Sequence, residues 1–346
     1  MSGATSPRVV VAADSRLMRR MLVNGLVRED MDVVGEASDG DEALALCREL
    51  SPDALSLDLA MPGTDGLVVL RTLRDASSPI PVVVVSAFSP VQGARAVDAL
   101  AEGAVDLVAK PAAGGPFDQF ARDLASKLRA AASSRVRRAV KTSPAAPAHP
   151  AHGRRAGTGT LRRVVIACST GGPRALAEVL PGLPERVGDG VLIVQHMPPG
   201  FTGSLAARLD RASAVSVREA KDGDRLDAGA ALIAPGGKHV RIGSDGTLRV
   251  TDDEPVGGLK PRADLAIVDA AETFGPELLL VVLTGMGRDA TEGAEHVKRR
   301  EGTVIAESEQ TCTVYGMPRS VIEAGLADHV LPLDEIADAI AREAGP

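Results

Sequence analysis

One serine lies where a hydroxyl could act as a nucleophile. Ser169 follows the apolar run Arg163–Cys168, which predicts a buried strand, and it begins the sequence Ser-Thr-Gly-Gly-Pro ahead of a helical pattern. The glycines let the backbone approach a substrate closely, and Pro173 suits the first turn of a helix. Free N–H groups at the start of that helix could stabilise an oxyanion. The segment by itself is compatible with a serine nucleophile or with the start of a phosphate-binding loop.

Two known loop patterns and one neighbouring thiol bear on that choice. The pattern G-x-x-x-x-G-K-[ST] is absent, which disfavours a nucleotide-binding loop. The hydrolase pattern G-x-S-x-G is nearly met by residues 167–171, where Ala167 replaces the first glycine. Cys168 could also be a nucleophile, but a small apolar residue at a strand end is more typical of the core.

A nucleophilic serine needs a base, and the base needs an acid that orients it. His196 follows the apolar run Val191–Val194, and Asp289 follows the run Leu278–Leu283. Because the carboxyl ends of parallel strands meet at one edge of a sheet, we predict that both residues lie beside Ser169.

The other histidines are weaker candidates for the base. His239 follows a glycine-rich turn and is the second choice. His296 and His329 are expected to be structural, one on a helix face and one at the start of a strand.

A second set of polar residues occupies strand ends near the N-terminus. Each ends or closely follows a short apolar run: Asp14, Asp58, Ser86, and Lys110 ahead of Pro111. Two carboxylates suit Mg²⁺, while a hydroxyl and an ammonium would hold the oxygens of a phosphoryl group. An Asp in this position can be the nucleophile that takes up the phosphoryl group. Any one of these residues alone would be an ordinary loop residue, but four in order predict a site.

The elements that must position this second set alternate along residues 8–128. Five apolar runs predict buried parallel strands: Val9–Ala12, Val33–Ala37, Ala54–Leu57, Pro81–Val85 and Val105–Val108. Helical patterns lie between and after them: Leu17–Val27, Glu42–Leu50, Leu67–Leu73, Gly93–Leu100 and Phe117–Leu128. This order predicts a doubly wound α/β domain over residues 1–128.

Composition changes after that domain. Residues 129–160 are basic, rich in Pro, Ala and Gly, and lack apolar periodicity, which predicts a flexible linker. Residues 161–346 return to strand-then-helix order, with a further strand at Ala231–Ile233, so a second, mainly parallel α/β domain is expected. Turn signals and short β runs in Ala231–Val250 predict an inserted hairpin.

Composition also limits the class of protein. The 346 residues carry a net charge of −7, with no Trp and one Tyr, which argues against nucleic acid or an anionic membrane surface as a partner. The three cysteines, Cys47, Cys168 and Cys312, are far apart and fit neither a disulfide framework nor a metal cluster. No signal peptide or transmembrane run is expected, so we predict a cytoplasmic protein without membrane insertion.

The first domain resembles the receiver domains of response regulators over residues 8–128. The sequences SLDLAMPGTDGL around Asp58 and AKPA around Lys110 carry the resemblance. It implies that Asp58 is the phosphoacceptor, that Asp14 and Asp58 bind Mg²⁺, and that a histidine kinase is the phosphodonor. It also implies that Ser86 is the switch hydroxyl and Lys110 the phosphate contact. Receivers carry two adjacent acidic residues after the first strand, and here Ala13 replaces one, which should weaken the metal site.

The second domain resembles the catalytic domain of the protein-glutamate methylesterases of bacterial chemotaxis. Five motifs match in order over nearly all of residues 161–346: ACSTGGPRAL, QHMPPGFTGSLAARLD, IAPGGKHV, LTGMGRDA and VYGMPRSV. The resemblance implies a triad of Ser169 as nucleophile, His196 as base and Asp289 as its orienting acid. Thr170 and Met286 become candidate contributors to the oxyanion region. The departures are small: Ala290 replaces a usual Gly, and Cys168 a usual small residue such as Ala.

The resemblance implies an enzyme that hydrolyses glutamyl methyl esters on methyl-accepting chemoreceptors and also deamidates glutamines. No cofactor is expected for the esterase reaction, and phosphorylation of the receiver is expected to control it. Two other classes of protein fit the sequence less well. A scaffold with an inactive hydrolase domain is disfavoured because Ser169, His196 and Asp289 are all present. A transcription factor is disfavoured by the acidic charge and by the absence of a helix-turn-helix pattern after residue 160.

Overall fold

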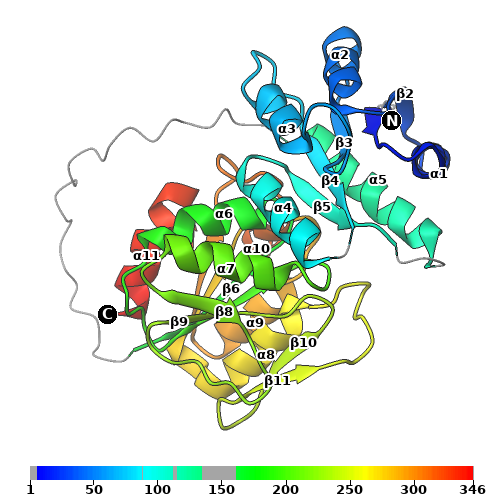
Figure 1. Cartoon of the computed structure of the whole chain (residues 1–346). Helices are drawn as coiled ribbons and strands as arrows, with labels where there is room; N and C mark the ends of the chain where they lie inside the picture. Colours follow the sequence, from blue (N-terminus) through cyan, green and yellow to red (C-terminus); the bar gives the residue numbers. More distant parts are fainter. Residues whose placement is uncertain (1–5, 88, 112–114, 135–160, 346) are drawn as a thin grey trace.

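Short runs of Val, Ile, Leu and Ala build two parallel β-sheets, each with helices on both faces (Figure 1). The computed structural model describes residues 6–87, 89–111, 115–134 and 161–345. Most of the predicted linker, residues 135–160, lies outside the described residues. The division into 1–128, 129–160 and 161–346 therefore stays a prediction.

The described part of residues 6–134 forms a five-stranded parallel sheet in the order β2-β1-β3-β4-β5. Its strands are β1 Arg8–Ala12, β2 Asp32–Ala37, β3 Ala54–Asp58, β4 Val82–Ser86 and β5 Asp106–Ala109. Its helices are α1 Arg16–Arg28, α2 Gly40–Leu50, α3 Gly66–Arg74, α4 Pro90–Ala101 and α5 Phe117–Ser133. All ten elements were predicted from the sequence, and α5 continues five residues past the predicted Leu128.

Alternating side chains of these strands enter two different cores, as expected for strands covered on both faces. Val9 and Val11 pack against α1 and α5, whereas Val10 and Ala12 pack against the side formed by α2, α3 and α4. This arrangement leaves the carboxyl ends of the strands as the edge where polar residues gather.

Residues 161–345 form a seven-stranded sheet in the order β14-β13-β12-β6-β7-β9-β8, again parallel throughout. The strands are β6 Arg163–Cys168, β7 Val191–Gln195, β8 Ser216–Glu219, β9 Ala230–Ile233, β12 Leu278–Val282, β13 Thr303–Glu307 and β14 His329–Leu331. The predicted hairpin is confirmed as the antiparallel pair β10 His239–Ile242 and β11 Leu248–Thr251.

Helices cover both faces of this second sheet. They are α6 Gly172–Val179, α7 Thr202–Ala212, α8 Ala263–Phe274, α9 Thr291–Arg299, α10 Met317–Glu323 and α11 Leu333–Ala344, with short 3-10 helices at Leu180–Gly182 and Gly275–Glu277. Side chains of α6, α7 and α11 share one core with Val164 and Ile166, and those of α8, α9 and α10 share another with Val165 and Ala167. Within the described ranges, no helix has the length and apolar character needed to cross a membrane.

The two sheets are joined through helices. In Figure 1, α4 lies against α6 and α7. At this contact Gly93 approaches the carbonyl of Gly200 and the ring of Phe201, which is almost fully buried. Arg208 of α7 forms an ion pair with Asp98 of α4 at 2.6 Å. The first domain therefore packs on the face of the second that carries the start of α6.

Candidate active site

The three central strands β6, β7 and β12 place Ser169 and His196 at one edge of the sheet. Cys168 pairs with Gln195, so Ser169 and His196 each follow directly after paired strand ends. The His196 N–H donates to the carbonyl of Cys168 at 3.1 Å, and the Ser169 N–H donates to Thr284, just after β12, at 3.0 Å. The predicted meeting of the first two residues at one sheet edge is thus found.

Asp289 contacts the histidine directly. His196 Nε2 and Asp289 Oδ2 lie 2.7 Å apart, and both side chains are largely buried. With Nε2–H donating to the carboxylate, Nδ1 is the ring nitrogen left to accept a proton. This is the orientation of a base by an acid that general-base catalysis requires.

The carboxylate of Asp289 is also held by backbone N–H groups. Those of Ala263 and Asp264, at the start of α8, donate to its two oxygens at 2.7 and 2.9 Å, and that of Ala290 donates at 3.0 Å. Burial alone would raise the pKa of Asp289, but the hydrogen bond from His196 and these backbone donors bring it well below its ordinary value. Asp289 therefore stays ionised beside the histidine.

Two residues that the sequence analysis did not single out surround this acid. Arg262 Nε lies 3.5 Å from Asp289, and another guanidinium nitrogen lies 2.6 Å from Asp264. Burial and the nearby charge of Asp289 raise the pKa of Asp264 to about 6. Helix α8 and strand β12 separate them from Asp289 in the chain, so no local motif indicated their closeness.

His239, the second candidate for the base, is fully buried and does not take this role. Its Nδ1 accepts from the Arg262 N–H at 3.3 Å, and its Nε2 lies 3.2 Å from the carbonyl of Glu254. His239 thereby connects Glu254 with Arg262, the residue that precedes α8. His296 lies on helix α9 and His329 begins β14, as predicted.

Two backbone N–H groups near Ser169 are available as hydrogen-bond donors. Among the described residues, the N–H groups of Thr170 and Met286 make no hydrogen bond within the protein, and the Ser169 hydroxyl has no partner. Unpaired N–H groups beside a serine are what an oxyanion site requires. Gly172 is needed here because a Cβ would lie 2.0 Å from Gln195 Oε1. The amide of Gln195 in turn donates to the Ser169 carbonyl at 2.9 Å.

Cys168 is ill suited to compete with Ser169. It is fully buried, and burial raises the pKa of its thiol far above the ordinary value. Its Sγ lies 3.0 Å from Gln195 Oε1, on the core side of the strand end. A thiol held in this protonated form is a poor nucleophile.

Residues of the first domain contact both sides of the serine turn. The Gly171 N–H donates to the Val105 carbonyl at 3.1 Å, and the Thr170 hydroxyl donates to Asp106 at 2.5 Å. On helix α5, the Ser126 hydroxyl lies 3.5 Å from the sulfur of Met286. The surface beside Ser169 is therefore partly covered.

The first domain has its own cluster at the carboxyl ends of β1, β3, β4 and β5. Asp58 is buried at the end of β3, where one oxygen accepts from Lys110 Nζ and the other from the Ala60 N–H at 3.0 Å. The Ser86 hydroxyl is directed to the carbonyl of Gln92 in α4 at 3.3 Å. Asp58, Lys110 and Ser86 are thus placed at one edge of the sheet, as the sequence predicts.

The oxygen donors at this edge fit a Mg²⁺ ion. Ala12 pairs with Leu57, so the exposed Asp14 and the buried Asp58 follow neighbouring strand ends. Two carboxylates at neighbouring strand ends suit Mg²⁺, which keeps several waters. Ala13 is buried and offers no ligand, while its carbonyl accepts from Arg19 at 2.5 Å. Nowhere in the described ranges do three or more His, Cys, Asp or Glu gather as metal ligands.

Comparisons with known proteins agree with both halves. Residues 164–340 match the CheB methylesterase family, and residues 9–118 match the response regulator receiver domain. A Symbiobacterium thermophilum protein named protein-glutamate methylesterase/protein-glutamine glutaminase is 44% identical over 98% of this chain and 97% of its own. A Pseudomonas aeruginosa protein of the same name, numbered 2, is 40% identical over 97% and 96% of the two chains.

A solved structure supports the fold of the second half. The crystal structure of the Thermotoga maritima CheB methylesterase catalytic domain is similar with a TM-score of 0.51 and 44% identity, over 52% of this chain and 97% of that chain. The match of whole chains, the two family matches and the strand-end placement of the site agree. This chain belongs to the family of protein-glutamate methylesterases in which a response-regulator receiver domain is fused to a CheB methylesterase domain.

Proposed function

We propose that this protein hydrolyses γ-glutamyl methyl esters on the cytoplasmic helices of chemoreceptors, with Ser169 as nucleophile. The observation that carries the proposal is the 2.7 Å contact between His196 and Asp289 at the sheet edge that also holds Ser169. A substrate on the cytoplasmic helices of receptors supports the further proposal that the protein acts in the cytoplasm.

The proposed ester hydrolysis uses the arrangement of Ser169, His196 and Asp289. The Ser169 hydroxyl attacks the ester carbonyl while His196 Nδ1 takes its proton, and Asp289 stabilises the resulting imidazolium. The N–H groups of Thr170 and Met286 are the proposed donors to the oxyanion. The imidazolium returns its proton to the departing methoxide, so methanol leaves and an acyl-serine remains. Water then attacks the acyl-serine with His196 again as base, giving glutamate and free serine.

The same acyl chemistry accounts for deamidation. A receptor glutamine presents an amide in place of the ester, and ammonia leaves in place of methanol. No group beyond the triad and the backbone donors is required for either substrate.

Control is assigned to the receiver domain. We infer that a histidine kinase supplies the phosphoryl group to Asp58, and that Lys110 and Ser86 contact its oxygens. Mg²⁺ held by Asp14 and Asp58 would offset the negative charge on those oxygens. The contacts of Val105 and Asp106 with the serine turn support a docked, inhibited state that phosphorylation loosens.

Replacing Ser169 by Ala tests the proposal. We expect Ser169→Ala to reduce methanol release from methyl-labelled receptor membranes by several orders of magnitude, because a nucleophile and its base act as a unit. The melting temperature should stay close to that of the wild type. Cys168→Ala is the matched control and should keep its activity, since the thiol lies on the core side. Near-normal turnover by Ser169→Ala would overturn the assignment.

A further inference from the structure

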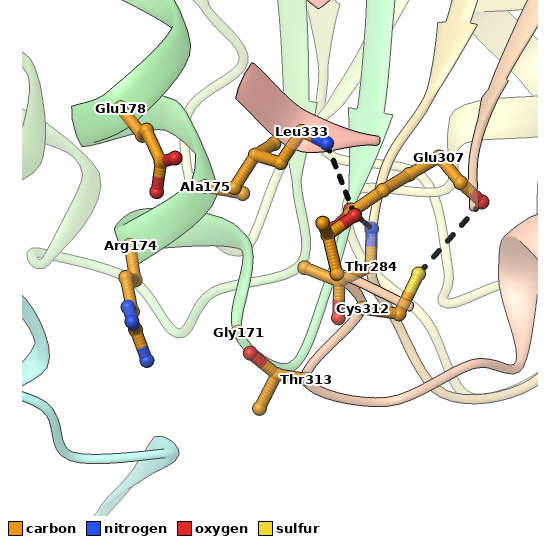
Figure 2. A pocket seen from close by; sticks show the side chains of 10 residues that line it. Gly171, Arg174, Ala175, Glu178, Thr284, Glu307, Cys312, Thr313 and Leu333 are labelled. Atoms are coloured by element: carbon orange, nitrogen blue, oxygen red, sulfur yellow. Dashed lines mark hydrogen bonds between the residues drawn. The ribbon is translucent and has the colours of Figure 1, made fainter. Parts of the chain in front are cut away.

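A small cavity lies beside the serine turn, on the side away from His196. Its volume is about 50 Å³, enough for one or a few waters. Figure 2 shows it between helix α6 and the segment that follows β13. Polar side chains contribute most of its lining: Arg174, Glu178, Glu307, Thr311, Cys312 and Thr313.

Glu307, at the end of β13, is the fully buried carboxyl of this cavity. In Figure 2 its side chain extends from β13 toward Thr284. Its Oε2 accepts from the Thr284 N–H at 2.8 Å, and its Oε1 has no partner among the described residues. A buried carboxyl with one unpaired oxygen costs stability. The hydrogen bond to Thr284 is therefore the contact through which Glu307 can act on the rest of the site.

Thr284 carries that contact to the catalytic turn. Its carbonyl accepts from the Ser169 N–H at 3.0 Å, and its hydroxyl donates to the Thr170 carbonyl at 2.9 Å. The same hydroxyl accepts from the Val314 N–H at 2.9 Å. One residue thus fixes the backbone of both the nucleophile and the candidate oxyanion donor, and Glu307 fixes that residue.

We propose that Glu307 is a positioning residue of the esterase, which orients the Ser169–Thr170 turn by holding the Thr284 N–H. This inference rests on the proposed function of Ser169. What the role requires is a hydrogen-bond acceptor at this place, and a negative charge is not needed. A positioning residue changes kcat even when the protein stays folded. A residue that only supports the fold changes activity only as far as it changes stability.

Two substitutions of similar size separate these roles. Glu307→Gln keeps an acceptor for the Thr284 N–H, whereas Glu307→Met removes it and leaves an apolar side chain. Glu307→Met leaves the buried Thr284 N–H without an acceptor, which should cost stability, so its melting temperature is compared with that of the wild type. Glu178→Gln is the matched control, because Glu178 lines the same cavity but makes no side-chain hydrogen bond or ion pair among the described residues.

The experiment measures kcat, KM and melting temperature for full-length proteins, activated with a small phosphodonor, on methyl-labelled receptor membranes. Glu307→Met should lower kcat by about 10- to 100-fold, the range expected when a reacting group is displaced by up to an ångström. Its KM should change by less than about twofold, since Glu307 does not face the substrate. Glu307→Gln and Glu178→Gln should keep kcat within a few-fold of the wild type, since both keep the acceptor at position 307.

Wild-type kcat in Glu307→Met would overturn the inference, as would an equal loss in Glu307→Gln. An inactive wild type would instead count against the proposed function. If Glu307→Met does not fold, the contact between Thr284 and Thr170 tests the next step, through which Glu307 would act on the turn. Thr284→Val removes the hydroxyl bound to Thr170 and should lower kcat by about tenfold or more, whereas Thr284→Ser should not. Equal kcat in that pair would overturn the inference too.

Discussion

At the scale of single residues, neighbouring carboxyls of the catalytic domain differ in pKa because their surroundings differ. Asp289 is surrounded by N–H donors and His196 and remains ionised, while the adjacent Asp264 has a pKa raised to about 6. The sequence indicated Asp289 because it follows a strand within a recognisable motif. It did not indicate Arg262, Asp264 or Glu307, because their roles depend on contacts between segments far apart in the chain.

Glu307 should make stability depend on pH. Burial is the largest cause that raises its pKa, from 4.5 to about 7, and the charge of Glu178 on α6 adds to it. The folded protein thus holds this proton more tightly than the unfolded chain does. Between about pH 4.5 and 7, the wild type should lose free energy of unfolding as pH rises, by on the order of 3 kcal/mol.

Glu307→Met removes this titration and supplies the comparison. Denaturant unfolding of the catalytic domain in both full-length proteins, from pH 4.5 to 8, should show the variant gaining stability relative to the wild type as pH rises. Four other ionisable groups lie near Glu307 and are the same in both proteins. They are Arg174, Glu178, Cys168 and Cys312. Parallel pH profiles would contradict the raised pKa.

At the scale of elements, the sequence predicted strands best where a continuous apolar run marks them. All five receiver strands and the strands β6, β7, β9 and β12 were found from apolar runs. The strand β8 was not found, because its four residues include only one buried apolar side chain, and of β14 only the start at His329 was predicted. β13 was also missed, since its run Thr303–Glu307 ends in a carboxyl that only the fold shows to be buried.

The end of β1 gives a prediction for the receiver. Ala13→Asp restores the second acidic residue beside Asp14 and should tighten Mg²⁺ binding by about 10- to 100-fold, the range typical of supporting groups around a metal. Faster uptake of label from a small phosphodonor at limiting Mg²⁺ should accompany it. Mg²⁺ titration of both proteins measures this effect, and Asp58→Asn serves as the control that takes up no label.

Two outcomes would count against this account of the receiver. Equal Mg²⁺ affinity with and without the added carboxylate would show that the position of Ala13 does not contribute to the metal site. No label on the wild type at saturating Mg²⁺ would remove Asp58 as the phosphoacceptor. A melting temperature for each variant separates these outcomes from misfolding, since Ala13 is buried.

At the scale of the whole molecule, the receiver and the catalytic domain share a buried apolar core through α4, α6 and α7. The sequence predicted the two domains but could not place one on the other, because domain contacts leave no periodic pattern. The hydrogen bonds of Val105 and Asp106 to the serine turn also join the two domains.

Deleting residues 1–160 should therefore raise basal esterase activity, because it exposes the surface beside Ser169. Asp106→Ala in the full-length protein should raise it less. It removes the bond to Thr170, together with the Lys127 and Leu107 contacts inside the receiver, while the Val105 carbonyl still contacts Gly171. Methanol release without a phosphodonor measures both. Ser169→Ala in the deleted protein is the blank, and a deletion variant no faster than the unphosphorylated full-length protein would argue against inhibition by docking.

Under the proposed docking through Val105 and Asp106, the receiver would act as a competitive inhibitor that is covalently attached to its own target. Its strength depends on a local concentration, typically millimolar for short flexible connections, and so does not change when the enzyme is diluted. Substrate, by contrast, competes through its own local concentration. Receptors crowded into one patch of membrane should therefore displace the receiver more readily than the same number scattered, and the proposed inhibition predicts an esterase that responds to receptor density as well as to phosphorylation.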